Sequence, residues 1–218
     1  MGAKIKGAGS NKIEIEGVKK LKNVSYNIMP DRIEAGTFLC MAATTNGNLV
    51  LQNVESNNII PIIEKLRETG CKINISKNEV EIKAPKRLKA VDIKTMPYPG
   101  FPTDMQSIFA TALTTAKGTS LIIENIFENR YKYTQELIRM GAKITIEGKT
   151  AIIKGTRKLY GANVKATDLR GGASLVLAGI MAKGITTVEN IEYILRGYEK
   201  FNKKLTDLGV NIKTKNRE

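Results

Sequence analysis

The fold is decided by a stretch that occurs three times: GTFLCMAATTNGNLVLQNVESNNIIPIIEKLRETGCKINI (36–75), MQSIFATALTTAKGTSLIIENIFENRYKYTQELIRMGAKITI (105–146) and ASLVLAGIMAKGITTVENIEYILRGYEKFNKKLTDLGVNIKT (173–214). The copies share two glycine positions and one asparagine position: Gly47, Gly118 and Gly184; Gly70, Gly141 and Gly209; Asn53, Asn125 and Asn190. Self-similarity at a nearly fixed period indicates one supersecondary unit used repeatedly. The sequence therefore predicts three units related by pseudo-threefold symmetry.

Each copy begins with an apolar segment rich in small residues, which predicts a helix surrounded by protein. These helices are expected near 37–46, 106–117 and 172–183. A glycine follows where a helix C-cap belongs, and then comes a short alternating strand. An amphipathic second helix and a closing strand complete the copy, and the closing strands are expected at CKINI (71–75), AKITI (142–146) and VNIKT (210–214).

Further strands are expected on both sides of this pattern. A second closing strand follows in the first two copies, at NEVEIK (78–83) and TAIIKG (150–155). Entry strands are expected at VSYNIM (24–29), AVDIKT (90–95) and ANVKAT (162–167). The sequence thus predicts an α/β fold of the α+β type, an inside-out lobe of three pseudo-symmetric βαβαββ units with helices inside and sheets outside.

Composition narrows the function classes. The 218 residues are 42% hydrophobic and 26% charged, as in soluble globular proteins, and no apolar run is long enough to cross a bilayer. No signal-peptide pattern opens the sequence, so we expect a cytoplasmic protein without a membrane partner. Two cysteines and no histidine argue against a disulfide framework, a zinc site of the cysteine type and a Ser-His-Asp triad. We therefore expect neither a metal nor a cofactor.

The net charge of +14 indicates an anionic partner, which could be nucleic acid, a membrane surface or a phosphorylated or carboxylated small molecule. The alternative is a generally solvated surface, because the lysines are scattered along the chain. Few aromatic side chains are available for stacking on bases, so nucleic acid is not the expected partner.

A short polar motif precedes each apolar helix: PDRIEAG (30–36), FPTDMQ (101–106) and TDLRGGAS (167–174). Each motif holds an aspartate, namely Asp31, Asp104 and Asp168. Helix N-termini favour anions, so the pseudo-symmetry would gather a binding region at one end of the lobe. The alternative is that the aspartates are ordinary N-caps. A rigid proline turn precedes Asp104, which favours a role in the site for this residue above the other two.

Two arginines lie in loops between a strand and the second helix, Arg130 in ENIFENR and Arg196 in YILRGYE. The first copy has no arginine at this place, and a feature absent from one copy favours a site over the scaffold. Arginine suits carboxylates and phosphates because its donors form a planar fork. The alternative is that both are solvated loop residues.

These motifs carry a resemblance. GFPTDMQ, ENIFENR, ATDLRGGASLVLAG, ILRGYE and IMPDRIEAGTF resemble the bacterial UDP-N-acetylglucosamine enolpyruvyl transferases, and the similarity extends along essentially all of the chain. The resemblance implies an enzyme that moves the enolpyruvyl group of phosphoenolpyruvate to the 3-hydroxyl of UDP-N-acetylglucosamine and releases phosphate, a step of peptidoglycan and cell-wall synthesis. It also implies two inside-out α/β barrel lobes, each with three βαβαββ units.

The resemblance implies roles for five residues. Asp104 would be the base that takes the proton from the sugar hydroxyl, and Ile126 would contact the nucleotide sugar. Arg196 would grip phosphoenolpyruvate when the lobes close, and Arg130 and Arg170 would be charged residues of the cleft between the lobes. The sequence departs from the family pattern at LRGGAS, where many relatives have alanine in place of one or both glycines; extra glycine loosens the first helical turn.

By the same resemblance the chain corresponds to the C-terminal half of such an enzyme. Residues 1–29 would be the remnant of a missing first lobe, and 30–218 the C-terminal lobe, with units at about 30–90, 91–160 and 161–218. Neither Cys40 nor Cys71 matches the family's general-acid cysteine, so the chain alone is expected to be inactive. The competing hypothesis is a stand-alone module that binds anions or nucleic acid without turnover.

Overall fold

The computed structural model describes residues 1–10 and 12–215. It divides into two compact units, Met1–Pro30 and Asp31–Glu218, of which the last three residues lie outside the described part. In the first unit, β1 (Lys4–Lys6) pairs antiparallel with β2 (Glu14–Glu16). The entry strand expected at 24–29 is wrong, because the residues there form no strand. A strand needs a hydrogen-bonded neighbouring strand, and the sheets of the described residues contain no strand from this segment.

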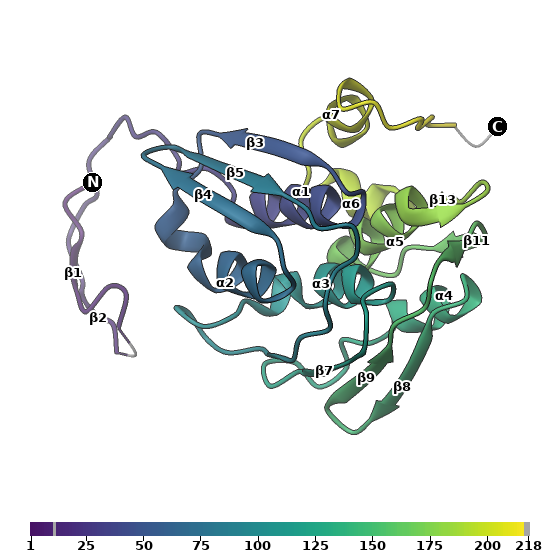
Figure 1. The fold of residues 1–218 in the computed structure, drawn as a ribbon. Helices are drawn as coiled ribbons and strands as arrows, with labels where there is room; N and C mark the ends of the chain where they lie inside the picture. The colour runs from purple at the N-terminus through teal and green to yellow at the C-terminus, as the bar shows by residue number, and fades with distance from the viewer. Residues whose placement is uncertain (11, 216–218) are drawn as a thin grey trace. The chain divides into compact units, whose positions relative to one another are not determined.

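The second unit contains the three copies in sequence order (Figure 1). The first copy comprises α1 (Arg32–Thr44), β3 (Asn48–Gln52), η1 (Ser56–Ile59), α2 (Ile60–Glu68), β4 (Lys72–Ser76) and β5 (Glu79–Lys83). The second comprises β6 (Ile93–Lys94), η2 (Thr103–Met105), α3 (Gln106–Leu113), β7 (Thr119–Ile123), α4 (Tyr133–Arg139), β8 (Lys143–Glu147) and β9 (Thr150–Lys154). The third comprises β10 (Leu159–Tyr160), β11 (Asn163–Lys165), α5 (Leu169–Met181), β12 (Ala182–Lys183), β13 (Thr187–Glu189), α6 (Glu192–Leu195) and α7 (Phe201–Asp207).

The first helices of the three copies form the centre of this unit. Helices α1, α3 and α5 contact one another, and every residue of α3 is buried. The second helices α2, α4 and α7 each bury only one stripe, which in α2 consists of Ile62, Ile63 and Leu66. Figure 1 shows α1, α3 and α5 inside, with β3–β5 and β7–β9 around them. The prediction that the apolar first helices are the buried ones is confirmed.

The sheets turn one face to the helices and the other to solvent. The first sheet has the antiparallel order β3-β5-β4, and the second has the order β6-β7-β9-β8, with β6 parallel to β7. Along β5, Val80 and Ile82 are buried, whereas Glu81 and Lys83 are exposed. This period of two follows from the pleat of a strand. The mixed α/β class with helices inside and sheets outside is as the sequence predicted.

The third copy departs from the predicted unit. Its described strands form two parallel pairs, β10 with β12 and β11 with β13. The closing strand expected at 210–214 is wrong, since the structure has no strand there. In the first two copies the closing strand pairs with a returning strand, β5 or β9, and the described third copy has no such strand. Val210 and Ile212 still pack against the core. The alternating apolar residues of this segment therefore indicate burial of one side, but they do not indicate a strand.

None of the described helices is both long and apolar enough to cross a lipid bilayer.

Candidate functional site

Two of the three aspartates before the central helices are N-caps. The Asp31 Oδ1 atom accepts hydrogen bonds from the backbone N–H groups of Ile33, at 2.7 Å, and Glu34, at 3.3 Å. The Asp168 Oδ1 atom accepts one from the N–H of Gly171 at 2.7 Å. Both side chains satisfy donors that a helix start leaves unpaired. The N-cap interpretation is therefore right for these two positions.

Asp104 is different, because its carboxylate caps no helix and instead lies between two arginines. It belongs to η2, whose N-cap residue makes no side-chain capping bond. Arg130 Nη2 donates to Asp104 Oδ1 at 2.7 Å. Arg170 donates to Asp104 Oδ2 through Nη2 at 3.3 Å and Nε at 3.4 Å. The carboxylate thus joins a loop of the second copy to helix α5 of the third, and its side chain is 41% exposed.

The two arginines are largely buried, with side-chain exposures of 17% for Arg130 and 12% for Arg170. The guanidinium of Arg130 lies 4.9 Å from the ring centre of Phe127, and that of Arg170 lies 5.4 Å from the ring centre of Tyr198. Stacking on an aromatic ring stabilises a cation and fixes the plane of its donors. Arg170 Nη1 is buried and has no hydrogen-bond partner among the described residues.

Tyr198 connects Arg170 to the first copy. Its hydroxyl lies 2.9 Å from the Thr37 hydroxyl on α1, and its ring packs on Phe201 with ring centres 4.7 Å apart. Burial raises the pKa of Tyr198, while the hydrogen bond with Thr37 lowers it by less. The phenol therefore stays protonated and acts as a packing and hydrogen-bonding group below Arg170.

The turn before Asp104 is tightly built. Gly100 has no room for a side chain, because an added Cβ would lie 2.5 Å from the Met96 Cβ. Phe101 is buried and packs edge-on against Phe109 of α3, with ring centres 5.2 Å apart. This packing anchors η2 against the central helix. The rigid turn predicted from the prolines is present and fixes the place of Asp104.

The loop after β7 carries Ile126 and Arg130. Ile126 is 39% exposed, and its neighbour Phe127 is 52% exposed. The base of the loop is held by Glu124, a buried carboxylate that accepts hydrogen bonds from the N–H groups of Ile126, at 2.9 Å, and Phe127, at 3.1 Å. Apolar side chains held out to solvent on a fixed loop offer a contact surface for a solute.

The side chain of Arg196 makes no hydrogen bond or ion pair with Asp104, Arg130 or Arg170. It is the C-cap residue of α6 and is exposed. Its backbone N–H donates to the Ile194 carbonyl oxygen, but within residues 1–10 and 12–215 its side chain makes no hydrogen bond or ion pair. The structure therefore brings Asp104, Arg130 and Arg170 into direct contact, places Ile126 on the loop of Arg130, and leaves Arg196 exposed to solvent.

Sequence reasoning missed four residues of the surroundings: Glu124, Thr103, Tyr198 and Thr37. Glu124 is the first residue of ENIFENR, where the sequence pattern indicates only the end of a strand. Thr103 stood next to Asp104 in FPTDMQ, where it reads as part of the turn. Tyr198 and Thr37 meet across the unit from positions 161 residues apart, a contact that no local pattern reveals.

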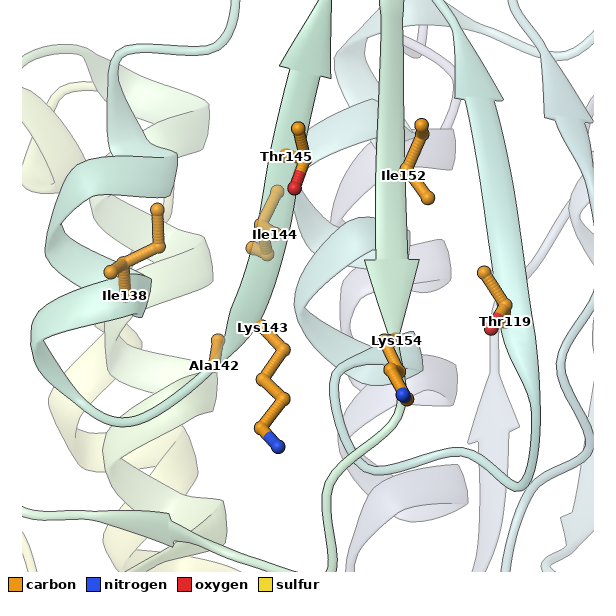
Figure 2. A pocket seen from close by; sticks show the side chains of 8 residues that line it. All are labelled: Thr119, Ile138, Ala142, Lys143, Ile144, Thr145, Ile152 and Lys154. Atoms are coloured by element: carbon orange, nitrogen blue, oxygen red, sulfur yellow. The ribbon is translucent and has the colours of Figure 1, made fainter.

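A shallow hollow lies elsewhere, beside α4 and the second sheet (Figure 2). Its lining comprises Thr119, Ile138, Ala142, Lys143, Ile144, Thr145, Ile152 and Lys154. None of the predicted site residues lines it. Among the residues that the structure describes, no group of three or more histidine, cysteine or acidic side chains could hold a metal ion.

Comparisons with known proteins agree on one family. The sequence model of the EPSP synthase (3-phosphoshikimate 1-carboxyvinyltransferase) family matches residues 1–205. UDP-N-acetylglucosamine 1-carboxyvinyltransferase 1 of Caldanaerobacter subterraneus subsp. tengcongensis is 54% identical over 212 residues, which are 97% of this chain and 51% of the relative. The UDP-N-acetylglucosamine 1-carboxyvinyltransferase of Desulfofundulus thermocisternus is 52% identical over 213 residues, 97% of this chain and 88% of the relative.

A solved structure shows the same fold. The enolpyruvyl transferase NikO from Streptomyces tendae superimposes with a TM-score of 0.85 at 26% identity, covering 95% of this chain and 50% of that one. The chain thus spans about half the length of several relatives it matches, including the Caldanaerobacter enzyme and NikO.

Proposed function

The chain belongs to the EPSP synthase family, and from that premise we propose that it forms one lobe of a UDP-N-acetylglucosamine 1-carboxyvinyltransferase. The reaction would transfer the enolpyruvyl group of phosphoenolpyruvate to the 3-hydroxyl of UDP-N-acetylglucosamine and release phosphate. Such a step would serve peptidoglycan synthesis in the cytoplasm. The identity of about half with relatives that carry this name supports the choice of substrate.

The observation that carries the proposal is the placement of Asp104. Of the three aspartates in the polar motifs before the central helices, it alone caps no helix and lies between two arginines. A carboxylate that solutes can reach and that is held in a fixed orientation is suited to accept a proton from a hydroxyl. We assign Asp104 as the base that takes the proton of the sugar 3-hydroxyl.

The remaining roles follow the surroundings of Asp104. Arg130 and Arg170 would hold the base in place and line an anion-binding cleft, since guanidinium donors match carboxylates and phosphates. Ile126, exposed on its anchored loop, would contact the nucleotide sugar. Arg196, whose exposed side chain has no partner among the described residues, would grip phosphoenolpyruvate when the other lobe closes over it.

The proposal needs a second lobe. The region of the relatives that this chain does not match would supply the general acid and most of the nucleotide-sugar pocket, and closure of the two lobes would exclude water. Residues 1–29 would belong to that other lobe, which is the N-terminal one in the relatives. Residues 30–218 would form the C-terminal lobe described above. Both cysteines of this chain are buried, Cys40 in α1 and Cys71 before β4, and burial raises the pKa of both thiols, which disfavours either as the general acid.

Phosphate release from phosphoenolpyruvate in the presence of UDP-N-acetylglucosamine tests this proposal. The 218-residue chain alone is expected to give no turnover, and the chain joined to the first half of the Caldanaerobacter relative is expected to give phosphate at a steady rate. Turnover by the isolated chain would refute the need for a second lobe. A well-folded joined protein with no turnover and no binding of either substrate would refute the proposed reaction.

A further inference from the structure

Glu124 has an environment that its place in the sequence does not suggest. It directly follows β7, and the residue is only 1% exposed. Its Oε1 atom accepts from the hydroxyl of Thr95 and the N–H of Ile126, both at 2.9 Å, and from the N–H of Phe127 at 3.1 Å. Its Oε2 atom accepts from the hydroxyl of Thr103 at 2.9 Å. Four donors converge on one buried carboxylate, which satisfies its lone pairs without a cation.

The four donors include groups from two segments of the site, called its two arms below: the loop 125–130 and the turn 101–104. Ile126 and Phe127 open the loop that ends at Arg130, and Thr103 immediately precedes Asp104. Glu124 therefore binds both the segment that carries Asp104 and the loop that carries Arg130, the two partners of the ion pair. A carboxylate in this place sets the relative position of the two arms.

The hydrogen-bond polarity extends the connection to the arginine itself. Arg130 Nη1 donates to the Thr103 hydroxyl oxygen at 3.1 Å, and guanidinium can only donate. The threonine has one hydrogen, which it gives to Glu124, so its oxygen lone pairs are directed to Arg130. Only an acceptor at position 124 enforces this order of donors.

We propose that Glu124 is a positioning residue: its buried carboxylate fixes the loop 125–130 and orients the Thr103 hydroxyl, and through these it sets the geometry of the Asp104–Arg130 pair. The inference rests on the proposed function for its effect on turnover, since it takes that pair to be part of the active site. Its structural half, the anchoring of the two arms, stands on the hydrogen bonds alone.

The substitution Glu124→Gln tests the charge and the acceptor pattern at nearly constant size. The NH₂ group would face either the donors at Oε1, which include the two loop amides, or the Thr103 hydroxyl at Oε2, and the remaining neutral oxygen accepts more weakly than a carboxylate. Loss of a buried hydrogen bond corresponds to a factor on the order of 10 to 100 in a local equilibrium. Glu147→Gln, at the exposed end of β8, is the matched control.

The first measurement is amide hydrogen exchange on the 218-residue chain. In Glu124→Gln, the N–H groups of Ile126 and Phe127 are expected to exchange about tenfold or more faster, while amides of β9 keep their wild-type rates. Unchanged exchange at both loop amides would overturn the anchoring. If Glu124→Gln does not fold, Glu124→Asp, whose carboxylate is one CH₂ group shorter and cannot reach all four donors, is read in the same way.

The second measurement is kcat/KM of the two-lobe protein, which is the chain joined to the first half of the Caldanaerobacter relative. Glu124→Gln is expected to lower kcat/KM for UDP-N-acetylglucosamine by about tenfold or more, with the loss measured per folded molecule. Adding Thr103→Val to it should cost much less than Thr103→Val costs alone, because both changes break one connection. Thr103→Ser, which keeps the hydroxyl, should retain activity. Fully additive losses would contradict the proposed coupling.

The two proposals fail in different ways. If Asp104→Asn abolishes turnover but Glu124→Gln keeps wild-type kcat and KM, the positioning role is refuted and the proposed function stands. If Asp104→Asn keeps full turnover, the proposed function is refuted, and the exchange rates of Ile126 and Phe127 still decide whether Glu124 anchors the loop.

Discussion

Replacing Asp104 by asparagine separates its chemical role from its structural one. Asparagine keeps an oxygen that can accept from Arg130 at the position of Oδ1, but it has no charge and presents an NH₂ group where Oδ2 accepts from Arg170. A neutral amide cannot take a proton from a hydroxyl. Loss of a positioned base lowers the rate by about 10²–10⁴-fold, so kcat of the two-lobe protein is expected to fall by that amount.

The structural cost of the same change can be worked from the contacts. The bonds from Arg170 to Asp104 are long, at 3.3 and 3.4 Å, and the carboxylate is partly exposed, so the ion pairs themselves contribute modestly. The greater cost arises at Arg170, which is 12% exposed and already has one unpaired Nη1 among the described residues. Leaving a second buried donor unpaired costs about 1–3 kcal/mol, or roughly 2–12 °C in Tm for a chain of this size.

The assays are phosphate release and thermal unfolding, with Asp31→Asn as the control. Asp31 lies in the corresponding polar motif of the first copy but is an N-cap, and asparagine caps as well as aspartate. The control should change neither the rate nor, beyond about 0.5 kcal/mol, the free energy of unfolding. Wild-type turnover in Asp104→Asn, or an equal loss in Asp31→Asn, would refute the reasoning.

Three further outcomes are expected. Gly172→Ala should destabilise the chain by about 1–3 kcal/mol in urea unfolding, because its Cβ would lie 2.7 Å from the Ile194 Cγ1 atom; an unchanged midpoint would contradict this. Burial raises the pKa of the Cys40 thiol above its ordinary value of 9.0, so above that pH the unfolded chain releases a proton that the folded chain keeps, and the free energy of unfolding should fall by up to about 1.4 kcal/mol per pH unit. Cys40→Ala should reduce that slope in denaturation curves measured at several pH values above 9.0, and an identical slope would argue against it. Arg196→Ala should leave Tm unchanged, since the side chain is exposed, yet lower kcat/KM of the two-lobe protein; an unaltered kcat/KM would remove Arg196 from the site.

The parts of the fold that the sequence predicted correctly are those governed by local pattern. The apolar segments within α1, α3 and α5 are hydrophobic on all sides, and such helices must be enclosed by protein. The strands expected at 24–29 and 210–214 failed because strand formation depends on a partner, and alternation within a segment carries no information about one. The same limit applies to the site: proline turns and caps are local, whereas the meeting of Thr37 with Tyr198 is not.

The start of each central helix also explains why, of the three motif aspartates, Asp104 alone does not cap a helix. In the first and third copies the helix begins directly after the aspartate, at Arg32 and Leu169, so the side chain faces unpaired N–H groups and caps them. In the second copy the 3₁₀ turn η2 places Asp104 one residue inside the first turn, past the capping position. Its carboxylate is then free to accept from arginines of the neighbouring segments. A local change in how one helix starts thus converts a scaffold position of the repeat into a candidate catalytic one.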